Sequence, residues 1–131
     1  MPNVPQDRAY TKEHEWVEST GKDRVRVGIT DYAQKQLGDI VFVELPAVGN
    51  KFEAGEAIGS VESVKSVSDI FLPVSGAVAA VNEELNDSPE DVNSDPYDGG
   101  WMFEITLSNA AELKDLLTAA QYEDYIKAES E

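Results

Sequence analysis

The sequence predicts a mainly β protein with a sandwich or barrel-like body, short helices and a helical C-terminal segment. Many short apolar segments rich in Val and Ile are separated by Gly and Pro turn residues, which is typical of all-β bodies. The chain has 131 residues, the length of one domain. After residue 109, apolar residues recur at helical spacing, and this predicts helices in the tail.

The N-terminal third predicts an irregular arm, a strand and a short helix. Residues 1–10 show no periodic pattern and are expected to be irregular. Residues 24–29 alternate apolar and polar side chains, which predicts a half-buried strand. A short helix is predicted next, because Thr30 or Asp31 suits its N-cap and Gly38 suits its end.

A hairpin is predicted in the middle of the chain, after a strand at residues 40–45. Residues 57–64 and 67–72 are rich in β-branched residues, and we expect two strands with a reversal near Lys65. Apolar residues spaced by three in this segment would also suit a helix. The serines and the Val and Ile content favour strands. The turn lacks the Asn-Gly signal of a two-residue hairpin.

The C-terminal third completes the predicted sheet and adds a tail. Strands are expected at residues 77–81 and 101–107, separated by a polar loop at residues 82–100. We expect one domain over residues 1–131, with a core at about 24–107.

The tail, about residues 109–128, is expected to be helical. Asn109 and Glu112 have the spacing of a capping box, and Thr118 with Gln121 suits the cap of a second short helix.

The charge of the chain limits its partners. Ten Lys and Arg against 26 Asp and Glu give a formal net charge of −16, which would repel nucleic acids and anionic membranes. It favours basic docking surfaces on other proteins, or high solubility alone. No apolar run approaches the ~20 residues that span a bilayer, and no targeting signal is recognisable. A bacterial cytoplasmic location is expected, or the mitochondrial matrix for a trimmed mature chain.

Thiol and metal chemistry find little support in the sequence. The chain has no cysteine, so any sulfur redox chemistry would have to come from an attached group. The only histidine, His14, is followed by Glu18 where a zinc-protease helix would need a second His. The run containing Asp91, Asn93 and Asp95 lacks the Gly and Glu of a calcium loop, so no metal site is expected.

Lys65 lies in the stretch ESVKSVSD and allows three interpretations. Most lysines are simply solvated surface residues. A Schiff-base amine would need a pKa depressed by burial or nearby cations, whereas Glu62 and Asp69 favour the ammonium form. An exposed lysine at a hairpin tip is also a suitable place for covalent attachment by a modifying enzyme. The residues alone leave the first and third interpretations open.

Several stretches, in order, resemble the H-protein family of the glycine cleavage system: HEWV, GDIVFVELPAVGNKFEAGE, ESVKSVSD, PVSGAVAAVNEEL and SPEDVNSDPYDGGWMFEI. The resemblance runs from about Tyr10 to Ile126, and its separate motifs keep a consistent spacing. The chain departs at Glu13, where the family often has Ser or Thr, and at DGGW, where GEGW or EDGW is common. Neither departure touches Lys65.

The resemblance implies a fold, a cofactor and a set of site residues. The fold would be a lipoyl-domain-like barrel-sandwich hybrid, and the chain a single lipoyl-carrier domain. Lys65 would carry lipoic acid through an amide, within an attachment loop that includes Glu62, Ser63 and Val64. The residues expected to contact the arm in a neighbouring cleft are Glu15, Asp69 and His14.

The same resemblance implies a carrier without catalysis of its own, expected to be a monomer. Its partners would be a pyridoxal-phosphate glycine decarboxylase, a tetrahydrofolate-dependent aminomethyltransferase, a dihydrolipoamide dehydrogenase and a lipoate-attaching enzyme. A borrowed dithiol suits a chain without cysteine. A tethered arm also replaces diffusion by a high local concentration.

Other carriers and an enzyme are alternatives. Lipoyl domains of 2-oxoacid dehydrogenase complexes typically have Asp where Val64 precedes the lysine, and biotin carriers have Met on both sides, where Val64 and Ser66 stand. An enzyme acting through Lys65 is opposed by its acidic flanks. An H-like protein that relays lipoate to other carriers has the same attachment chemistry, and the sequence leaves it open.

Overall fold

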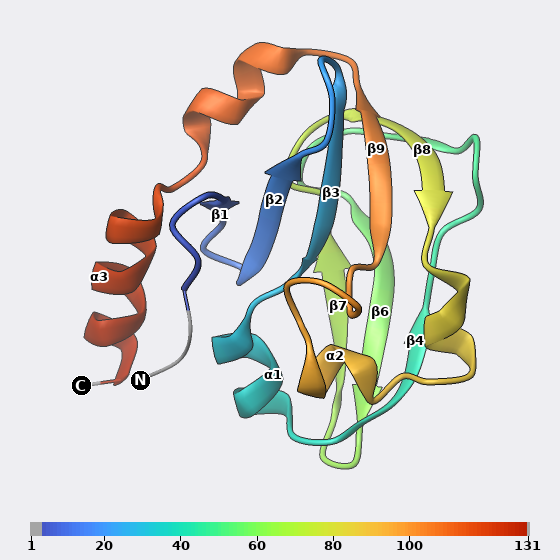
Figure 1. Ribbon diagram of the computed structural model, residues 1–131, viewed down its shortest axis with the longest axis vertical. Helices are drawn as coiled ribbons and strands as arrows, with labels where there is room; N and C mark the ends of the chain where they lie inside the picture. Colours follow the sequence, from blue (N-terminus) through green and yellow to red (C-terminus); the bar gives the residue numbers. More distant parts are fainter. Residues whose placement is uncertain (1–3, 131) are drawn as a thin grey trace.

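The computed structural model describes residues 4–130 and contains two antiparallel sheets around a hydrophobic core (Figure 1). The six-stranded sheet has the order β1 (Ala9–Tyr10), β2 (Glu15–Ser19), β3 (Arg24–Ile29), β9 (Phe103–Leu107), β8 (Gly76–Val81) and β5 (Lys51–Phe52). The three-stranded sheet has the order β4 (Ile40–Glu44), β6 (Ala57–Ser63) and β7 (Val67–Phe71). The predicted mainly β class is confirmed.

The core lies between the two sheets. Val27 and Phe103 face each other across β3 and β9, and both are fully buried. From the other sheet, Val43 and Val61 form a directly opposite pair that is also buried. Burial of such side chains contributes about 1.5–3 kcal/mol each, so the sheets hold the hairpin β6–β7 in a fixed orientation.

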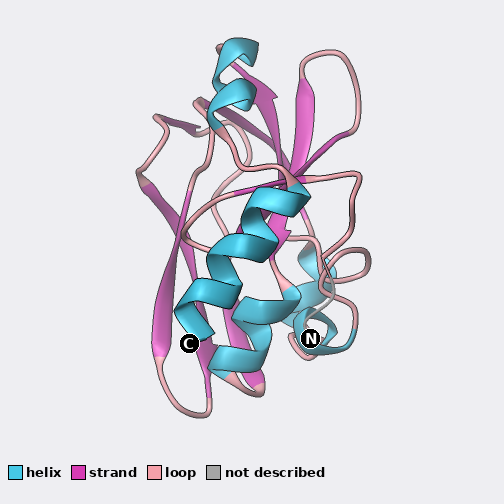
Figure 2. Cartoon of the chain, turned by 90° about the vertical axis from the view of Figure 1, so that its left-hand side faces the viewer, coloured by secondary structure: helices cyan, strands magenta, loops and turns pink. Residues whose placement is uncertain are grey.

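Strand β2 is one element that the sequence analysis did not predict. Its first three residues, Glu15, Trp16 and Val17, are all buried, so the strand lacks the alternation of a half-exposed strand. Helix α3 (Ala119–Ser130) covers it from outside the sheet through a cluster of buried residues comprising Tyr10, Trp16, Tyr97, Ala119, Tyr122 and Ile126. Figure 2 shows α3 running across the front of the strands.

Helix α1 (Asp31–Leu37) follows the prediction at both ends. The Thr30 side chain accepts a hydrogen bond from the amide of Ala33, as an N-cap does. Gly38 ends the helix with φ 83°, a backbone conformation that favours glycine, and its N–H donates to the carbonyl of Gln34.

The segment 82–100, expected to be a polar loop, is more ordered than predicted. It forms a 3-10 helix (Glu83–Asn86) and the short helix α2 (Asp91–Ser94). Leu85, Val92 and Tyr97 are buried. Single apolar residues spaced widely among polar ones anchor this segment, and such spacing matches neither a strand nor a helix pattern.

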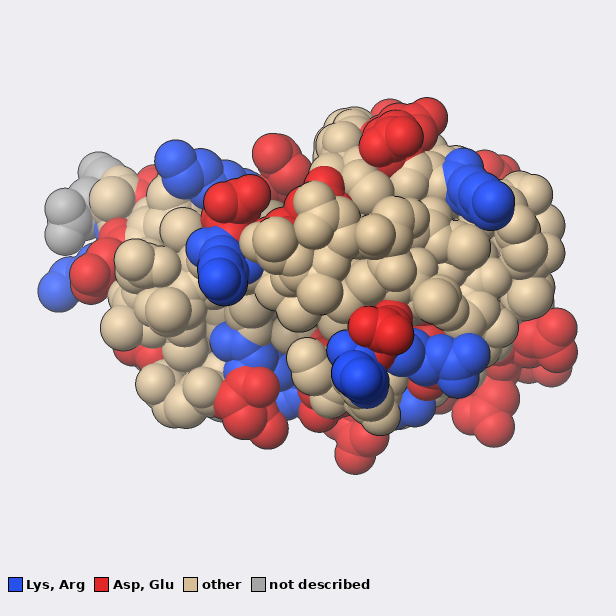
Figure 3. Space-filling view, turned by 90° about the horizontal axis from the view of Figure 1, so that it is seen from above, with Lys and Arg blue, Asp and Glu red and all other residues tan. Residues whose placement is uncertain are grey.

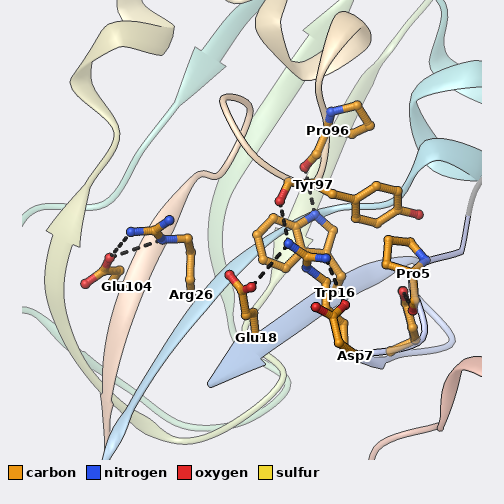
Figure 4. Close-up of polar contacts among 10 residues, drawn as sticks. Pro5, Asp7, Trp16, Glu18, Arg26, Pro96, Tyr97 and Glu104 are labelled. Carbon is orange, nitrogen blue, oxygen red and sulfur yellow. Dashed lines mark hydrogen bonds and ion pairs between the residues drawn. The ribbon is translucent and has the colours of Figure 1, made fainter. Parts of the chain in front are cut away.

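Hydrogen bonds tie this segment to the six-stranded sheet, as Figure 4 shows. The indole N–H of Trp16 donates to the carbonyl of Pro96 at 2.9 Å. On the same sheet, the Arg26 guanidinium pairs with Glu104 at 2.8 Å. The part of this segment that follows α2 is therefore held against β2, while α2 itself lies against α1.

The tail departs from its prediction at one of its two caps. Residues Ala110–Asp115 form a 3-10 helix rather than an α-helix. Asn109 caps the amide of Ala111, but the Glu112 carboxylate accepts from the amide of Ser75 and so does not complete a capping box. The second cap forms as predicted, because Thr118 and Gln121 exchange reciprocal hydrogen bonds.

Charge is mixed on the end of the molecule opposite the β6–β7 turn. Figure 3, seen from that end, shows Lys and Arg interspersed with Asp and Glu rather than gathered into one basic surface. Within residues 4–130, no helix combines the length and the apolar character that a membrane span requires.

Candidate functional site

Lys65 lies at the tip of the β6–β7 hairpin, which projects at the bottom of Figure 1. Glu62 and Val67 are the last directly paired residues, and the amide of Ser63 donates to the carbonyl of Ser66 at 2.8 Å to close the turn. Lys65 is solvent-exposed, as are its neighbours Val64 and Ser66. The predicted reversal near Lys65 is confirmed.

The turn is built without the Asn-Gly pair of the commonest short hairpins because the Ser63 side chain takes part. Its Oγ accepts hydrogen bonds from the amides of Lys65 and Ser66, each at 3.1 Å. Neither Val64 nor Lys65 is among the described residues with positive φ. A serine hydroxyl thus satisfies amides that would otherwise be free at the tip, and it fixes the backbone that carries Lys65.

The tip rests on the segment that follows α1. The amide of Val64 donates to the carbonyl of Asp39 at 3.0 Å. The Lys65 stem passes over Gly38, where an added Cβ would lie 3.4 Å from Lys65 Cε. Gly38 therefore ends the helix and also leaves room for the lysine.

Asn93 holds that supporting segment in place. Its Oδ1 accepts from the amide of Ile40 at 2.8 Å. Its Nδ2 donates to the carbonyl of Gly38 and to the Gln34 side chain, each at 2.9 Å. All three bonds connect α2 to the end of α1 and the start of β4, so α2 indirectly positions the tip.

A cavity of about 260 Å³ begins beside this support, between α1, β7 and the C-terminal end of α3. Leu37, next to Gly38, is one of its lining residues. All three residues predicted as cleft contacts, His14, Glu15 and Asp69, also line it. The structure thus brings these three together around one hollow, whereas Glu62, Ser63 and Val64 belong to the tip.

Glu15 is the most unusual group in the cavity wall. Its side chain is 2% exposed, and it accepts hydrogen bonds from the Thr11 hydroxyl at 2.8 Å and from the amide of Phe71 at 3.2 Å. Burial raises the pKa of the Glu15 carboxyl from 4.5 to about 7, although both hydrogen bonds favour the ionised form. No ion pair of Glu15 occurs among the salt bridges of the described chain.

His14 connects the cavity to α3. Its backbone has φ 69°, which is uncommon for a residue other than glycine. Nδ1 lies 2.9 Å from the Tyr122 hydroxyl, and Nε2 lies 3.1 Å from Glu129 Oε2. Burial lowers the pKa of the imidazole, and the Glu129 carboxylate opposes that shift. His14 therefore holds the last turn of α3 at the cavity wall.

Asp69 also lines the cavity and is exposed on β7. No group of three or more His, Asp or Glu with metal-binding geometry occurs among residues 4–130.

Sequence reasoning missed the residues that support the tip. Asn93 figured only in a calcium-like run, and no local pattern pointed to its contacts with Gly38 and Ile40. Ser63 was expected in the attachment loop, and its role in the turn had one signal, a serine two residues before the predicted reversal at Lys65, because serine side chains favour local bonds to backbone amides. No sequence signal pointed to Glu129, near the C-terminal end of the chain.

Comparison with known proteins agrees with this geometry. The profile of the family described as Glycine cleavage H-protein matches residues 8–129. The glycine cleavage system H protein of Bacillus licheniformis is 55% identical over 125 residues, covering 95% of this chain and 98% of that protein. The one from Halalkalibacterium halodurans is 54% identical over 129 residues, covering 98% and 100%.

The same relationship appears in three dimensions. The crystal structure of a glycine cleavage system H protein from Mycobacterium marinum superimposes with a TM-score of 0.83 at 41% identity, covering 98% of this chain and 100% of that one. The fold expected from the resemblance is therefore confirmed. By its profile match, its relatives and its structural neighbour, this chain belongs to the glycine cleavage H-protein family.

Proposed function

We propose that this chain is the lipoyl-carrying shuttle of glycine cleavage, with lipoic acid bound as an amide to Nζ of Lys65. The main support for this proposal is the position of Lys65. It is an exposed lysine on a turn that is closed by Ser63 and supported by the segment after α1. Membership of the H-protein family supplies the role of the protein. The whole chain, residues 1–131, would act as one carrier domain.

The site fits such an attachment. No carboxylate pairs with the Lys65 ammonium among the ion pairs of the described chain, so the amine is open to acylation. Held by an amide on Lys65, lipoate would supply a reducible disulfide that can carry an aminomethyl group between glycine decarboxylase, the tetrahydrofolate-dependent aminomethyltransferase and dihydrolipoamide dehydrogenase. The rigid turn would present this arm to each partner at high local concentration.

The cavity beside the tip would shelter a charged load. Glu15 lines the cavity at a buried position where ionisation is costly, and the exposed Asp69 lines it from β7. A cationic amine entering the cavity would favour the ionised form of the Glu15 carboxyl and lower its raised pKa. We therefore assign Glu15 and Asp69 as contacts of the load. His14 would act mainly by holding α3 at the wall.

Two alternatives assign the protein a different role. An enzyme using Lys65 as a nucleophile would need a desolvated amine, but Lys65 is exposed. A relay protein that hands lipoate to other carriers would use the same turn without serving glycine cleavage. We also propose a monomer of the bacterial cytoplasm, a location favoured by its bacterial relatives.

Reconstitution with glycine decarboxylase tests the function. The lipoylated protein, mixed with the decarboxylase, glycine and labelled bicarbonate, is expected to support exchange of label into the glycine carboxyl. Lys65→Arg keeps the positive charge and is expected to give only background exchange. Exchange that is absent with fully lipoylated protein would contradict the shuttle role and favour the relay.

A further inference from the structure

Exposed apolar side chains gather beside Lys65. The described chain has five large apolar residues that are strongly exposed, and four of them lie on the three-stranded sheet or its turn. These four, here called the apolar patch, are Val41 (49% exposed), Phe42 (51%), Val64 (66%) and Val67 (65%). The fifth, Val48, lies in the connection from β4 to β5.

The strand register explains how the patch forms. Phe42 lies opposite Glu62, and Glu62 lies opposite Val67, so the three side chains form a row on one face. This face points outward, because the next pair inward, Val43 and Val61, is buried. A register shift between Ile40 and Phe42 leaves Val41 as an extra residue, and two successive apolar side chains are thereby exposed.

Acidic side chains, here called the acidic rim, lie in and beside the patch. Glu62 stands within the row, and the next row on the same face places Glu44 opposite Ser60. Both acids are exposed. A surface of this kind fits a protein face with an apolar centre and a rim of Lys or Arg, whereas a membrane of anionic lipids would repel the acidic side chains.

The short side chain of the unmodified lysine indicates which partner uses the patch. The Lys65 side chain has only a four-carbon stem, so an enzyme that acylates Nζ has to seat its own surface on the turn. Enzymes that act at the end of the attached arm do not need to contact the turn itself. No other lysine in residues 4–130 has a strongly exposed large apolar neighbour in the chain, so the patch also distinguishes Lys65 from them.

We propose that the apolar patch and its acidic rim are the docking surface for the lipoate-attaching enzyme and select Lys65 among the exposed lysines. The inference rests on the proposed attachment at Lys65. In the step that this docking permits, the amine of Lys65 attacks the carbonyl carbon of an activated lipoyl adenylate. An amide bond forms, the bond from carbonyl carbon to phosphate oxygen breaks, and AMP and a proton leave.

The test measures attachment directly. Purified unmodified protein is incubated with a lipoate–protein ligase, lipoate and ATP, and the mass increment is followed over time. The double variant Phe42→Ser, Val67→Ser is expected to lower kcat/KM at least about tenfold, mainly through KM, because truncated interface anchors weaken docking. Val48→Ser, with the same chemistry outside the sheet, is the matched control. Thermal unfolding of all three proteins verifies that each is folded.

The rim is tested by salt. Wild-type attachment is expected to slow as ionic strength rises, and the variant Glu44→Gln, Glu62→Gln is expected to lose most of this dependence. Equal kcat/KM for wild type and the patch variant, with the label on Lys65, would overturn the docking surface while leaving the proposed function intact. Label on another lysine would overturn the proposed function itself.

A second assay checks the choice of partner. The patch variant, loaded to completion, is compared with loaded wild type in the glycine decarboxylase exchange reaction. A loss seen in attachment and much smaller in exchange supports the attaching enzyme as the occupant. An equal or larger loss in exchange would assign the patch to the decarboxylase and overturn our assignment. A patch that holds two copies together would be revealed by a dimer of wild type that the variant lacks, which would likewise overturn it.

Discussion

Replacing the buried Glu15 by Gln should change stability in a way that depends on pH. The folded protein raises the pKa of this carboxyl from 4.5 to about 7. Between these two values the folded chain therefore holds more protons at Glu15 than the unfolded chain does, so stability from this group falls as pH rises. Above about pH 7 the buried carboxyl is ionised in the folded protein. The rise in its pKa then corresponds to a loss of about 3 kcal/mol from the free energy of unfolding.

Gln imitates the protonated carboxyl in shape and charge, and it removes this cost. We expect Glu15→Gln to raise the free energy of unfolding by about 2–3 kcal/mol more at about pH 8 than at about pH 5. A constant penalty of about 1 kcal/mol accompanies it at both pH values, because Gln cannot accept both hydrogen bonds that reach Glu15. Because this penalty is the same at both pH values, it cancels when the two free-energy changes are subtracted.

Urea unfolding at the two pH values measures this difference. His14, whose pKa burial lowers, titrates in both proteins alike and cancels in the comparison. Glu44→Gln is the matched control, because Glu44 is exposed and loses the same charge. The same stabilisation by Glu15→Gln at both pH values would show that the carboxyl has an ordinary pKa, and it would refute the argument that burial makes its ionisation costly.

Two further predictions concern the support of the tip. Ser63→Ala removes the acceptor of two turn amides, so we expect it to lower the free energy of unfolding by about 1–2 kcal/mol and to slow lipoate attachment. The control Ser66→Ala, at an exposed position, should do neither. Urea unfolding measures the first effect and the ligase assay the second. Asn93→Ala leaves the Ile40 amide and the Gly38 carbonyl without their partner, so we expect the free energy of unfolding to fall by about 1–3 kcal/mol. Hydrogen exchange at the Val64 amide should also be faster in this variant than in the control Asn86→Ala. Unchanged exchange at Val64 would show that the support does not depend on Asn93.

The carrier hairpin could be predicted from the sequence because its signals are local. β-branched residues on both sides of Lys65 predict strands, and the chain must reverse between them. Helix α1 was predictable for the same reason, since Thr30 and Gly38 act on their own neighbours. The family resemblance then supplied the role of Lys65, which the residues alone left open.

The support and the cavity could not be predicted because their contacts join distant parts of the chain. Asn93 reaches Ile40 across 53 positions, and Glu15 receives the amide of Phe71 across 56. Strand β2 was missed because both of its faces are covered, which removes the alternating pattern. Such contacts are decided by the packing of the two sheets and α3 rather than by any short stretch of sequence.

The central claim is that the amine of Lys65 becomes the tether of lipoic acid. The most direct measurement is intact-protein mass spectrometry after expression with lipoate, followed by mapping of the modified peptide, for wild type and Lys65→Arg. The account predicts one lipoyl increment on Lys65 in wild type and none in the variant. An increment on a different lysine, or one that persists in Lys65→Arg, would contradict it.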